Sequence, residues 1–304
     1  MPYIKKILCR ADGKRAFEIL INCGFCMKDS QRLIDKKRIF CGPVLVDTKN
    51  EILNGEIFMI DYECMSRGIY PIFENDDFAV FDKPSGILSH PNGRHCEYSL
   101  CDEIWTLFGK NANVAHRLDR ETSGLLIASK NPKSADELKN MFEKKTVQKI
   151  YFALVSGRVN ENFICNKPIG KAYSDDEIGI KMRIRDDGKP AITEFYPLKF
   201  YENIGESGAT LIKAIPKTGR QHQIRLHLFH MKHKIFGDPL YGLETYAAEA
   251  IMDKKLSIFD RVKFSGATRL CLHAAEISFT FKGENFHIKS KIDFEKEFLD
   301  ATKI

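Results

Sequence analysis

The polar cluster at residues 116–124, His-Arg-Leu-Asp-Arg-Glu-Thr-Ser-Gly, is the densest group of chemically capable side chains in the sequence. In it the carboxylate of Asp119 stands between the cations Arg117 and Arg120. Neighbouring positive charges keep a carboxylate ionised, whereas burial alone would neutralise it. The apolar run after Gly124 predicts a buried strand that anchors the loop. The pattern therefore indicates one charged carboxylate on a fixed loop, although on its own it fits a solvated surface loop equally well.

A second polar cluster lies at residues 217–227, Lys-Thr-Gly-Arg-Gln-His-Gln-Ile-Arg-Leu-His. We expect a strand here, with Gln223, Arg225 and His227 on one face, because side chains alternate along a strand. An arginine on a rigid element can pair with a carboxylate through two parallel hydrogen bonds. A structural salt bridge to any acid is the plain alternative. Asp119 lies far earlier in the chain, so only the fold could bring it to Arg225.

The remaining apolar patterns predict a mixture of strands and helices. Asn-Asp-Asp at 75–77 separates two apolar runs, which indicates a β-hairpin. Residues 131–146 predict a helix that begins with a capping box formed by Ser134 and Glu137. A β-rich run follows at 149–157. Because helices and strands do not alternate regularly, we expect an α+β fold with a mixed, largely antiparallel sheet and flanking helices, and no doubly wound parallel sheet.

Residues 1–64 are expected to form a separate small module of two helices and a small sheet. A linker is expected near 62–70, and residues 70–304 would form the main domain. The second helix of the module has a basic face, for which an ordinary solvated surface is the plain interpretation. Such a face could also contact phosphates, with an affinity that falls with salt and depends little on base sequence. Its cations are Lys28, Arg32, Lys36, Lys37 and Arg38.

The composition is that of an ordinary soluble globular protein, with 304 residues of which 43% are hydrophobic and 29% charged. A formal net charge of +6 favours a polyanionic partner without establishing one. The nine cysteines follow no regular framework, so Cys23 and Cys26 form an isolated pair, and we predict free thiols and no metal site. The N-terminus lacks a signal-peptide pattern, and no apolar run reaches about 18 residues. We therefore expect a cytoplasmic protein with no membrane partner.

The cluster at 116–124 resembles the signature of the RluA-like family of pseudouridine synthases. Other motifs of that family have counterparts here in the same order, which makes coincidence improbable. These counterparts are Lys83-Pro84-Ser85-Gly86, Lys149-x-Tyr151, the segment at 217–227, and the segments at 235–242 and 269–274. The N-terminal module is similar to the small alpha-L RNA-binding module, which also occurs in a ribosomal small-subunit protein.

The resemblance implies isomerisation of uridine to pseudouridine within RNA, with no cofactor and no metal. Asp119 would be the catalytic residue, which either attacks the ribose or removes a ribose proton. Arg225 would pair with it. Tyr151 would stack on a uracil drawn out of the RNA helix and help to move the proton from ring carbon 5. Arg117 would fill the vacated space, and further RNA contacts are expected at His116, Arg120, Lys149, Arg220 and His222.

Ribosomal RNA is the favoured substrate, with transfer RNA as the second choice. Two other functions compete with this one. A non-catalytic RNA-binding or ribosome-assembly factor would need none of the residue types at Asp119, Tyr151 and Arg225, and Tyr151 alone would fit a half-buried core position. Hydrolysis of a nucleoside usually needs a second acid or a metal-activated water. The one acid near the motif, Glu121, is interpreted as a solvated loop residue.

Overall fold

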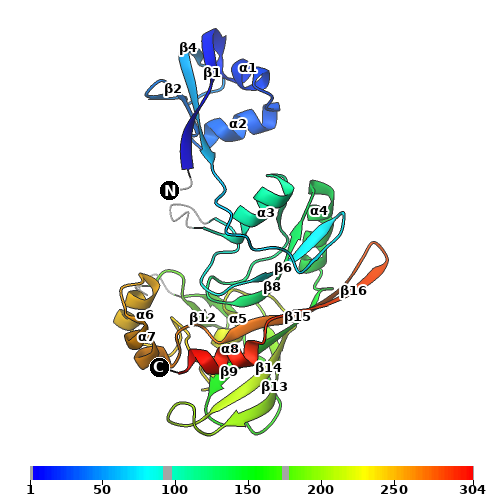
Figure 1. Ribbon diagram of the computed structural model, residues 1–304, viewed down its shortest axis with the longest axis vertical. Coiled ribbons are helices and arrows are strands. Elements are labelled where there is room, and N and C mark those ends of the chain that lie inside the picture. The colour runs from blue at the N-terminus through cyan, green and yellow to red at the C-terminus, as the bar shows by residue number, and fades with distance from the viewer. Residues whose placement is uncertain (1–2, 92–97, 173–177, 304) are drawn as a thin grey trace. The chain divides into compact units, whose positions relative to one another are not determined.

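The structure is a computed structural model that describes residues 3–91, 98–172 and 178–303 (Figure 1). The chain divides into two compact units, a smaller one that ends at Met65 and a larger one that begins at Ser66. Each has its own apolar core, and each is described by itself.

The smaller unit is an antiparallel sheet with two helices, and its strand order is β1-β4-β2-β3. The two predicted helices are present. The first strand was not predicted, because its sequence is rich in Lys and Arg and it is stabilised by pairing along β4. The elements are β1 (Tyr3–Arg15), α1 (Ala16–Asn22), α2 (Met27–Asp35), β2 (Ile39–Cys41), β3 (Val44–Leu45) and β4 (Ile52–Tyr62).

The larger unit is built on a mixed sheet with helices around it (Figure 1). Its strands, taken over the described ranges, are β5 (Phe73–Glu74), β6 (Phe78–Lys83), β7 (Asn113–Val114), β8 (Ser123–Ser129), β9 (Gln148–Ser156), β10 (Phe163–Asn166), β11 (Ile169–Lys171), β12 (Met182–Ile184), β13 (Ile192–Tyr201), β14 (Ala209–Pro216), β15 (Leu272–Phe281) and β16 (Glu284–Lys289). Its helices are α3 (Leu100–Phe108), α4 (Pro132–Glu143), α5 (Gln223–His230), α6 (Thr245–Met252), α7 (Ile258–Ser265) and α8 (Phe294–Ala301).

The main sheet has the order β10-β13-β14-β9-β15-β8-β6-β5, with β16 also paired to β15 and β7 to β8. The β8/β15 pair is parallel and the other pairs are antiparallel, while β11 and β12 form a separate ribbon. This topology confirms the predicted α+β fold with a mixed, largely antiparallel sheet. The predicted hairpin at 75–77 is also confirmed, because it connects β5 and β6.

The strand after the polar cluster is β8, and all seven of its residues are buried, as predicted. Leu125 and Ile127 pack into one apolar cluster, and Leu126 and Ala128 pack into another. Alternation along the strand therefore sends side chains into cores on both faces of the sheet. A strand fixed on both faces is a rigid support for the loop that precedes it.

The predicted helix at 131–146 is α4, but its predicted capping box is wrong. Asn131 is the N-cap, its side chain accepts the backbone N–H of Ser134, and Pro132 occupies the first helical position. Proline is favoured there because the first N–H groups of a helix lack partners in any case. None of the helices in the described ranges combines the length and the apolar character needed to cross a membrane.

Candidate active site

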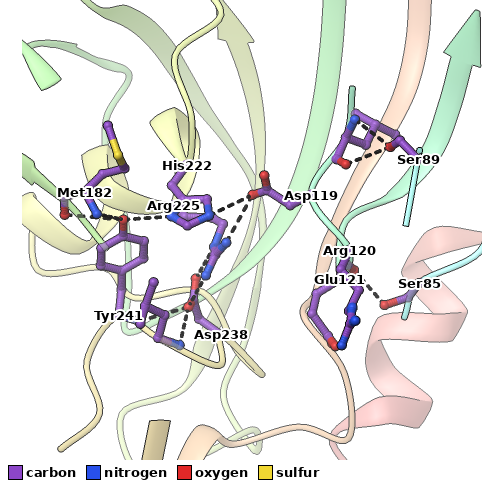
Figure 2. A network of polar contacts seen from close by, with 12 residues as sticks. Ser85, Ser89, Asp119, Arg120, Glu121, Met182, His222, Arg225, Asp238 and Tyr241 are labelled. Atoms are coloured by element: carbon purple, nitrogen blue, oxygen red, sulfur yellow. Dashed lines mark hydrogen bonds and ion pairs between the residues drawn. The ribbon is translucent and has the colours of Figure 1, made fainter. Parts of the chain in front are cut away.

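The Asp119 loop runs from the end of β7 to the start of β8 and is bonded to the loop that follows β6. The Ser89 hydroxyl donates to the carbonyl of Leu118 at 2.8 Å and accepts the N–H of the same residue at 3.0 Å. The Ser85 hydroxyl donates to the carbonyl of Glu121 (Figure 2). Asp119 is thus held by backbone contacts on both sides of it, while 28% of its side chain remains exposed.

A glycine of the motif brings the β8 and β15 strands together. Gly124 pairs with Ala274 of β15, and a β-carbon at position 124 would lie 2.3 Å from the Ala274 carbonyl oxygen. Its φ of +108° is also one that L side chains rarely adopt. Ala274 pairs in turn with Tyr151 of β9, and Gly124 pairs with Lys83 of β6. Paired residues thus run in one row across β6, β8, β15 and β9, from Lys83 at one end to Tyr151 at the other, next to the Asp119 loop.

Arg225 is delivered by helix α5, so the predicted strand at this position is wrong. Its Nη1 donates to Asp119 Oδ2 at 3.0 Å, which confirms the predicted contact between the two residues. Its Nε and Nη2 donate to the two oxygens of Asp238 at 2.8 Å each (Figure 2). Asp238 also accepts the backbone N–H groups of Leu240 and Tyr241. The guanidinium therefore cannot turn away from Asp119 without breaking a buried bidentate pair.

The charges around Asp119 keep it ionised. Burial would raise the pKa of Asp119, but His222, which is protonated in the acidic range where Asp119 titrates, and the cations Arg225 and Lys83 hold this pKa below its usual range. The pKa of Arg225 is raised further above its usual value, because the carboxylates of Asp238 and Asp119 outweigh the effect of burial. The described residues include no group of three or more His, Cys, Asp or Glu side chains placed to hold a metal ion. The arrangement can present an anionic oxygen to a bound molecule at neutral pH.

Tyr151 lies half-buried on β9 and packs against two of the apolar clusters of the larger unit. Burial and the charge of Asp119 raise the pKa of its hydroxyl, so the phenol stays protonated. The neutral ring of Tyr151 can therefore stack on a planar group that is held beside the ionised carboxylate of Asp119. The same raised pKa argues against Tyr151 as a base that takes the carbon 5 proton.

Two residues near Asp119 were not assigned a role from the sequence. Asp238 lies in the matched segment at 235–242, and it proves to be the second carboxylate that fixes Arg225. Lys83 is 1% exposed and donates to the carbonyls of Pro84, Ile87 and Arg120. Burial lowers the pKa of Lys83 to about 7, and Asp119 opposes this effect. The Lys-Pro-Ser-Gly motif was the available signal, because Lys83 is the last residue of a mostly apolar strand, and lysine is almost never fully buried unless it is paired.

Two of the predicted RNA-binding residues, His116 and His222, make contacts inside the protein, and RNA contact by them stays a prediction. Nε2 of His116 accepts the N–H of Ile127, and its ring stacks on Phe142 at 4.4 Å. Burial and Lys149 lower the pKa of His116 to about 3. The His222 side chain is 6% exposed, and burial and Arg225 lower its pKa to about 4. Neither imidazole carries a positive charge for phosphate at neutral pH.

The other predicted RNA contacts of this unit are more accessible. Arg117 is exposed, and Arg120, Lys149 and Arg220 are half-buried. Nε of Arg220 donates to the carbonyl of Pro190, which ties it to the loop before β13. Burial lowers the pKa of Lys149, whose ammonium lies 5.9 Å from the ring centroid of Phe142. RNA contact by these four residues stays a prediction.

Glu121 was interpreted as a solvated residue, and this is wrong. Its carboxylate accepts Nη2 of Arg261 at 2.7 Å, and both side chains are 19% exposed. Arg261 belongs to α7, so the ion pair ties that helix to the Asp119 loop. Sequence alone gave no signal for it, because the two residues are 140 positions apart.

The basic face of the smaller unit lies on α2 and the turn after it. Lys28, Arg32, Lys36 and Lys37 are exposed. Burial and the charges of Arg32 and Arg38 lower the pKa of Lys36, which shows that the cations crowd one another. Arg38 differs from the rest, since its guanidinium stacks over the Tyr3 ring and donates to the Tyr3 hydroxyl.

This fold, with one clamped aspartate before a buried strand, places the chain among proteins of the pseudouridine synthase fold. The solved structure of Human RNA Pseudouridylate Synthase Domain Containing 1 matches it with a TM-score of 0.59 and 24% sequence identity. That match covers 75% of this chain and 86% of the human one.

Sequence relatives identify the family. The family model described as RNA pseudouridylate synthase matches residues 77–230. An RNA pseudouridine synthase of Helicobacter pylori strain J99 is 40% identical over 265 residues, which is 87% of each chain. The dual-specificity RNA pseudouridine synthase RluA of Vibrio parahaemolyticus is 33% identical over 68% of this chain and 76% of its own. The chain belongs to the RNA pseudouridylate synthase family and is an RluA-like RNA pseudouridine synthase.

Proposed function

We propose that the protein converts uridine to pseudouridine in structured RNA, with Asp119 as the catalytic residue. The observation that carries the proposal is the 3.0 Å contact between Asp119 and an arginine that Asp238 holds in place. An ionised, fixed and partly exposed carboxylate suits either attack on the ribose or removal of a ribose proton. The ribose bond to ring nitrogen 1 breaks and a bond to ring carbon 5 forms. The proton of carbon 5 leaves and nitrogen 1 gains one, so no redox step is needed.

The target base must leave the RNA helix before Asp119 can reach its ribose. We assign the stacking surface for the flipped uracil to the ring of Tyr151. Its hydroxyl stays protonated, because burial and the charge of Asp119 raise its pKa. Arg117 is exposed in the Asp119 loop and would occupy the space that the base vacates. Lys149, Arg120 and Arg220 would contact phosphates around the site.

Replacing Asp119 with Asn tests the catalytic assignment. The neutral amide retains the size of the side chain but loses the charge, so we expect no pseudouridine while RNA affinity is largely retained. Asp76→Asn is the matched control, because Asp76 is exposed in the β5–β6 hairpin. Product would be measured by tritium release from uridine labelled at carbon 5, and free uracil would be measured in parallel. Turnover by pure Asp119→Asn protein would exclude the catalytic role, and release of uracil by the wild type would indicate hydrolysis.

We further propose that the smaller unit binds RNA through the face that carries Arg32 and Lys36. The double variant Arg32→Gln/Lys36→Gln should weaken binding and reduce the slope of log K against log salt by roughly 0.7–0.9 for each phosphate that the variant no longer neutralises. The control is Lys14→Gln/Lys49→Gln, which removes two exposed cations that lie outside α2 and the turn after it. Equal slopes for the two variants would contradict an RNA-binding role of this face.

Ribosomal RNA is our preferred substrate, because a basic module attached to the catalytic unit suits a large folded RNA. Mapping pseudouridines in total RNA with and without the gene tests this choice. Loss of one or more sites in ribosomal RNA is the expected result. Loss confined to transfer RNA would replace ribosomal RNA by transfer RNA as the substrate.

A further inference from the structure

His222 stands in a backbone conformation that needs an explanation. Its φ is +55° at the N-cap of α5, and a left-handed conformation is uncommon for residues other than glycine. Such strain persists only where the surroundings enforce it, and it gathers at functional sites. The strained position sends the imidazole between Asp119 and Tyr241 (Figure 2).

The two ring nitrogens of His222 face different partners. Nδ1 lies 3.0 Å from the hydroxyl of Tyr241, and Nε2 lies 3.8 Å from Asp119 Oδ2. Tyr241 is 2% exposed, and its hydroxyl oxygen accepts the N–H of Met182 at 3.1 Å. The Met182 carbonyl oxygen is a poorer acceptor, because it lies 3.4 Å from the Tyr241 hydroxyl. The hydroxyl therefore donates its hydrogen bond to Nδ1 of His222.

The imidazole is neutral at physiological pH, because burial and Arg225 lower its pKa to about 4. A neutral imidazole carries one N–H. If Nδ1 accepts from Tyr241, that N–H is on Nε2 and points toward the carboxylate. The opposite tautomer would set a lone pair of Nε2 against the anionic oxygen, which is unfavourable.

We propose that Tyr241 and His222 are positioning residues, in which Tyr241 fixes the tautomer of His222 and His222 presents its Nε2–H to Oδ2 of Asp119. This inference rests on the proposed role of Asp119. Arg225 donates to the same oxygen, so both polar neighbours act on Oδ2. In the described part of the chain Oδ1 receives no hydrogen bond, and Figure 2 shows it directed away from these partners. The geometry therefore assigns the reacting oxygen to Oδ1.

The distance of 3.8 Å is longer than a hydrogen bond, so His222 acts on Asp119 through its N–H dipole in this structure. Catalytic hydrogen bonds are often long in a free enzyme and shorten when substrate binds. A movement of about 0.6 Å would bring Nε2 within bonding distance. The contact would then resist rotation of the carboxylate as Oδ1 approaches the ribose.

The tautomer can be read directly on the full-length wild-type protein by nitrogen-15 NMR of labelled histidine. The His222 signals are assigned by their loss in His222→Gln. We expect a protonated Nε2 and an unprotonated Nδ1 in the wild type. In Tyr241→Phe we expect a mixture of tautomers. A protonated Nδ1 in the wild type overturns the proposal, and this result does not depend on catalysis.

Kinetics give the second test, because His222→Gln can place an amide N–H near the position of Nε2 while His222→Leu cannot. We expect kcat to fall about tenfold in His222→Leu with KM unchanged, and to recover most of this loss in His222→Gln. Wild-type turnover in His222→Leu would refute a positioning role. Equal losses in the Leu and Gln variants would show that His222 is only structural. Failure of the proposed function would appear differently, as activity in Asp119→Asn with the His222 tautomer unchanged.

Discussion

Substituting Gly124 with Ala should destabilise the larger unit through a clash that can be calculated from the backbone. The new β-carbon would lie 2.3 Å from the carbonyl oxygen of Ala274 and 2.6 Å from its nitrogen, so β15 must move away from β8. Forcing extra volume into a packed region costs about 1–3 kcal/mol. The left-handed backbone adds about 1–2 kcal/mol for a residue with a β-carbon. We expect a total loss of about 2–5 kcal/mol, a large part of the roughly 5–15 kcal/mol that stabilises a typical domain.

Gly283→Ala is the matched control. Gly283 has a φ of +85°, and nothing lies within 4 Å of its would-be β-carbon, so alanine there meets backbone strain without a clash. Both substitutions reduce the entropy of the unfolded chain equally, and this contribution cancels in the comparison. Gly124→Ala should therefore be less stable than Gly283→Ala by about 1–3 kcal/mol, the cost of the added volume alone.

Urea denaturation followed by tryptophan fluorescence is the assay, because the single tryptophan, Trp105, lies on α3 of the larger unit. At temperatures where Gly124→Ala stays folded, kcat should also fall, since Ser123 and the Asp119 loop must follow β8. Equal free energies of unfolding for the two alanine variants would refute the reasoning, because they would show that the sheet absorbs the β-carbon without displacement of β15.

Three further results are expected. Asp238→Asn should lower kcat and the free energy of unfolding, because Arg225 would lose one of its two counterions in a buried site, and breaking such pairs costs about 3–5 kcal/mol. Kinetics and urea denaturation measure the two effects. Unchanged values would show that Asp238 does not hold Arg225 in place. The folded-state pKa of Lys83 is about 7, below its ordinary 10.5, so the unfolded chain binds more protons between these values and stability should rise as the pH increases from 7 toward 10.5. Lys83→Met should flatten that rise in urea denaturation at pH 7 and 9.5, and an unaltered slope would show that Lys83 is not its source. Glu121→Gln should lower kcat less than Asp238→Asn does, because the ion pair of Glu121 with Arg261 anchors the Asp119 loop without contacting Arg225. An equal loss of kcat would show that Glu121 matters as much as Asp238 for holding Asp119 and Arg225 together.

Helix α5 shows how a correct residue can be predicted on the wrong element. Apolar residues at 224, 226 and 228 alternate with polar ones, which is the pattern of a strand. In the structure the helix is surrounded, and residues 223 to 228 are all buried, including Arg225 at 4% and His227 at 0% exposure. A helix buried on all sides has no solvent face, so the 3.6-residue period that normally identifies a helix is absent.

The sequence by itself determined which residue types could do the chemistry and the local elements that hold some of them. The buried strand β8, the hairpin at 75–77 and the polar loop of Asp119 follow from patterns within a few residues, where propensity and alternation act. Only the tertiary structure decided which charges meet. Asp238 clamps Arg225, Arg261 holds Glu121, and His222 lies inside the protein, because contacts between distant segments depend on strand order and helix packing. Neither strand order nor helix packing can be predicted from the residues near each charged side chain. The free energy of a buried ion pair arises only when the fold removes both partners from water.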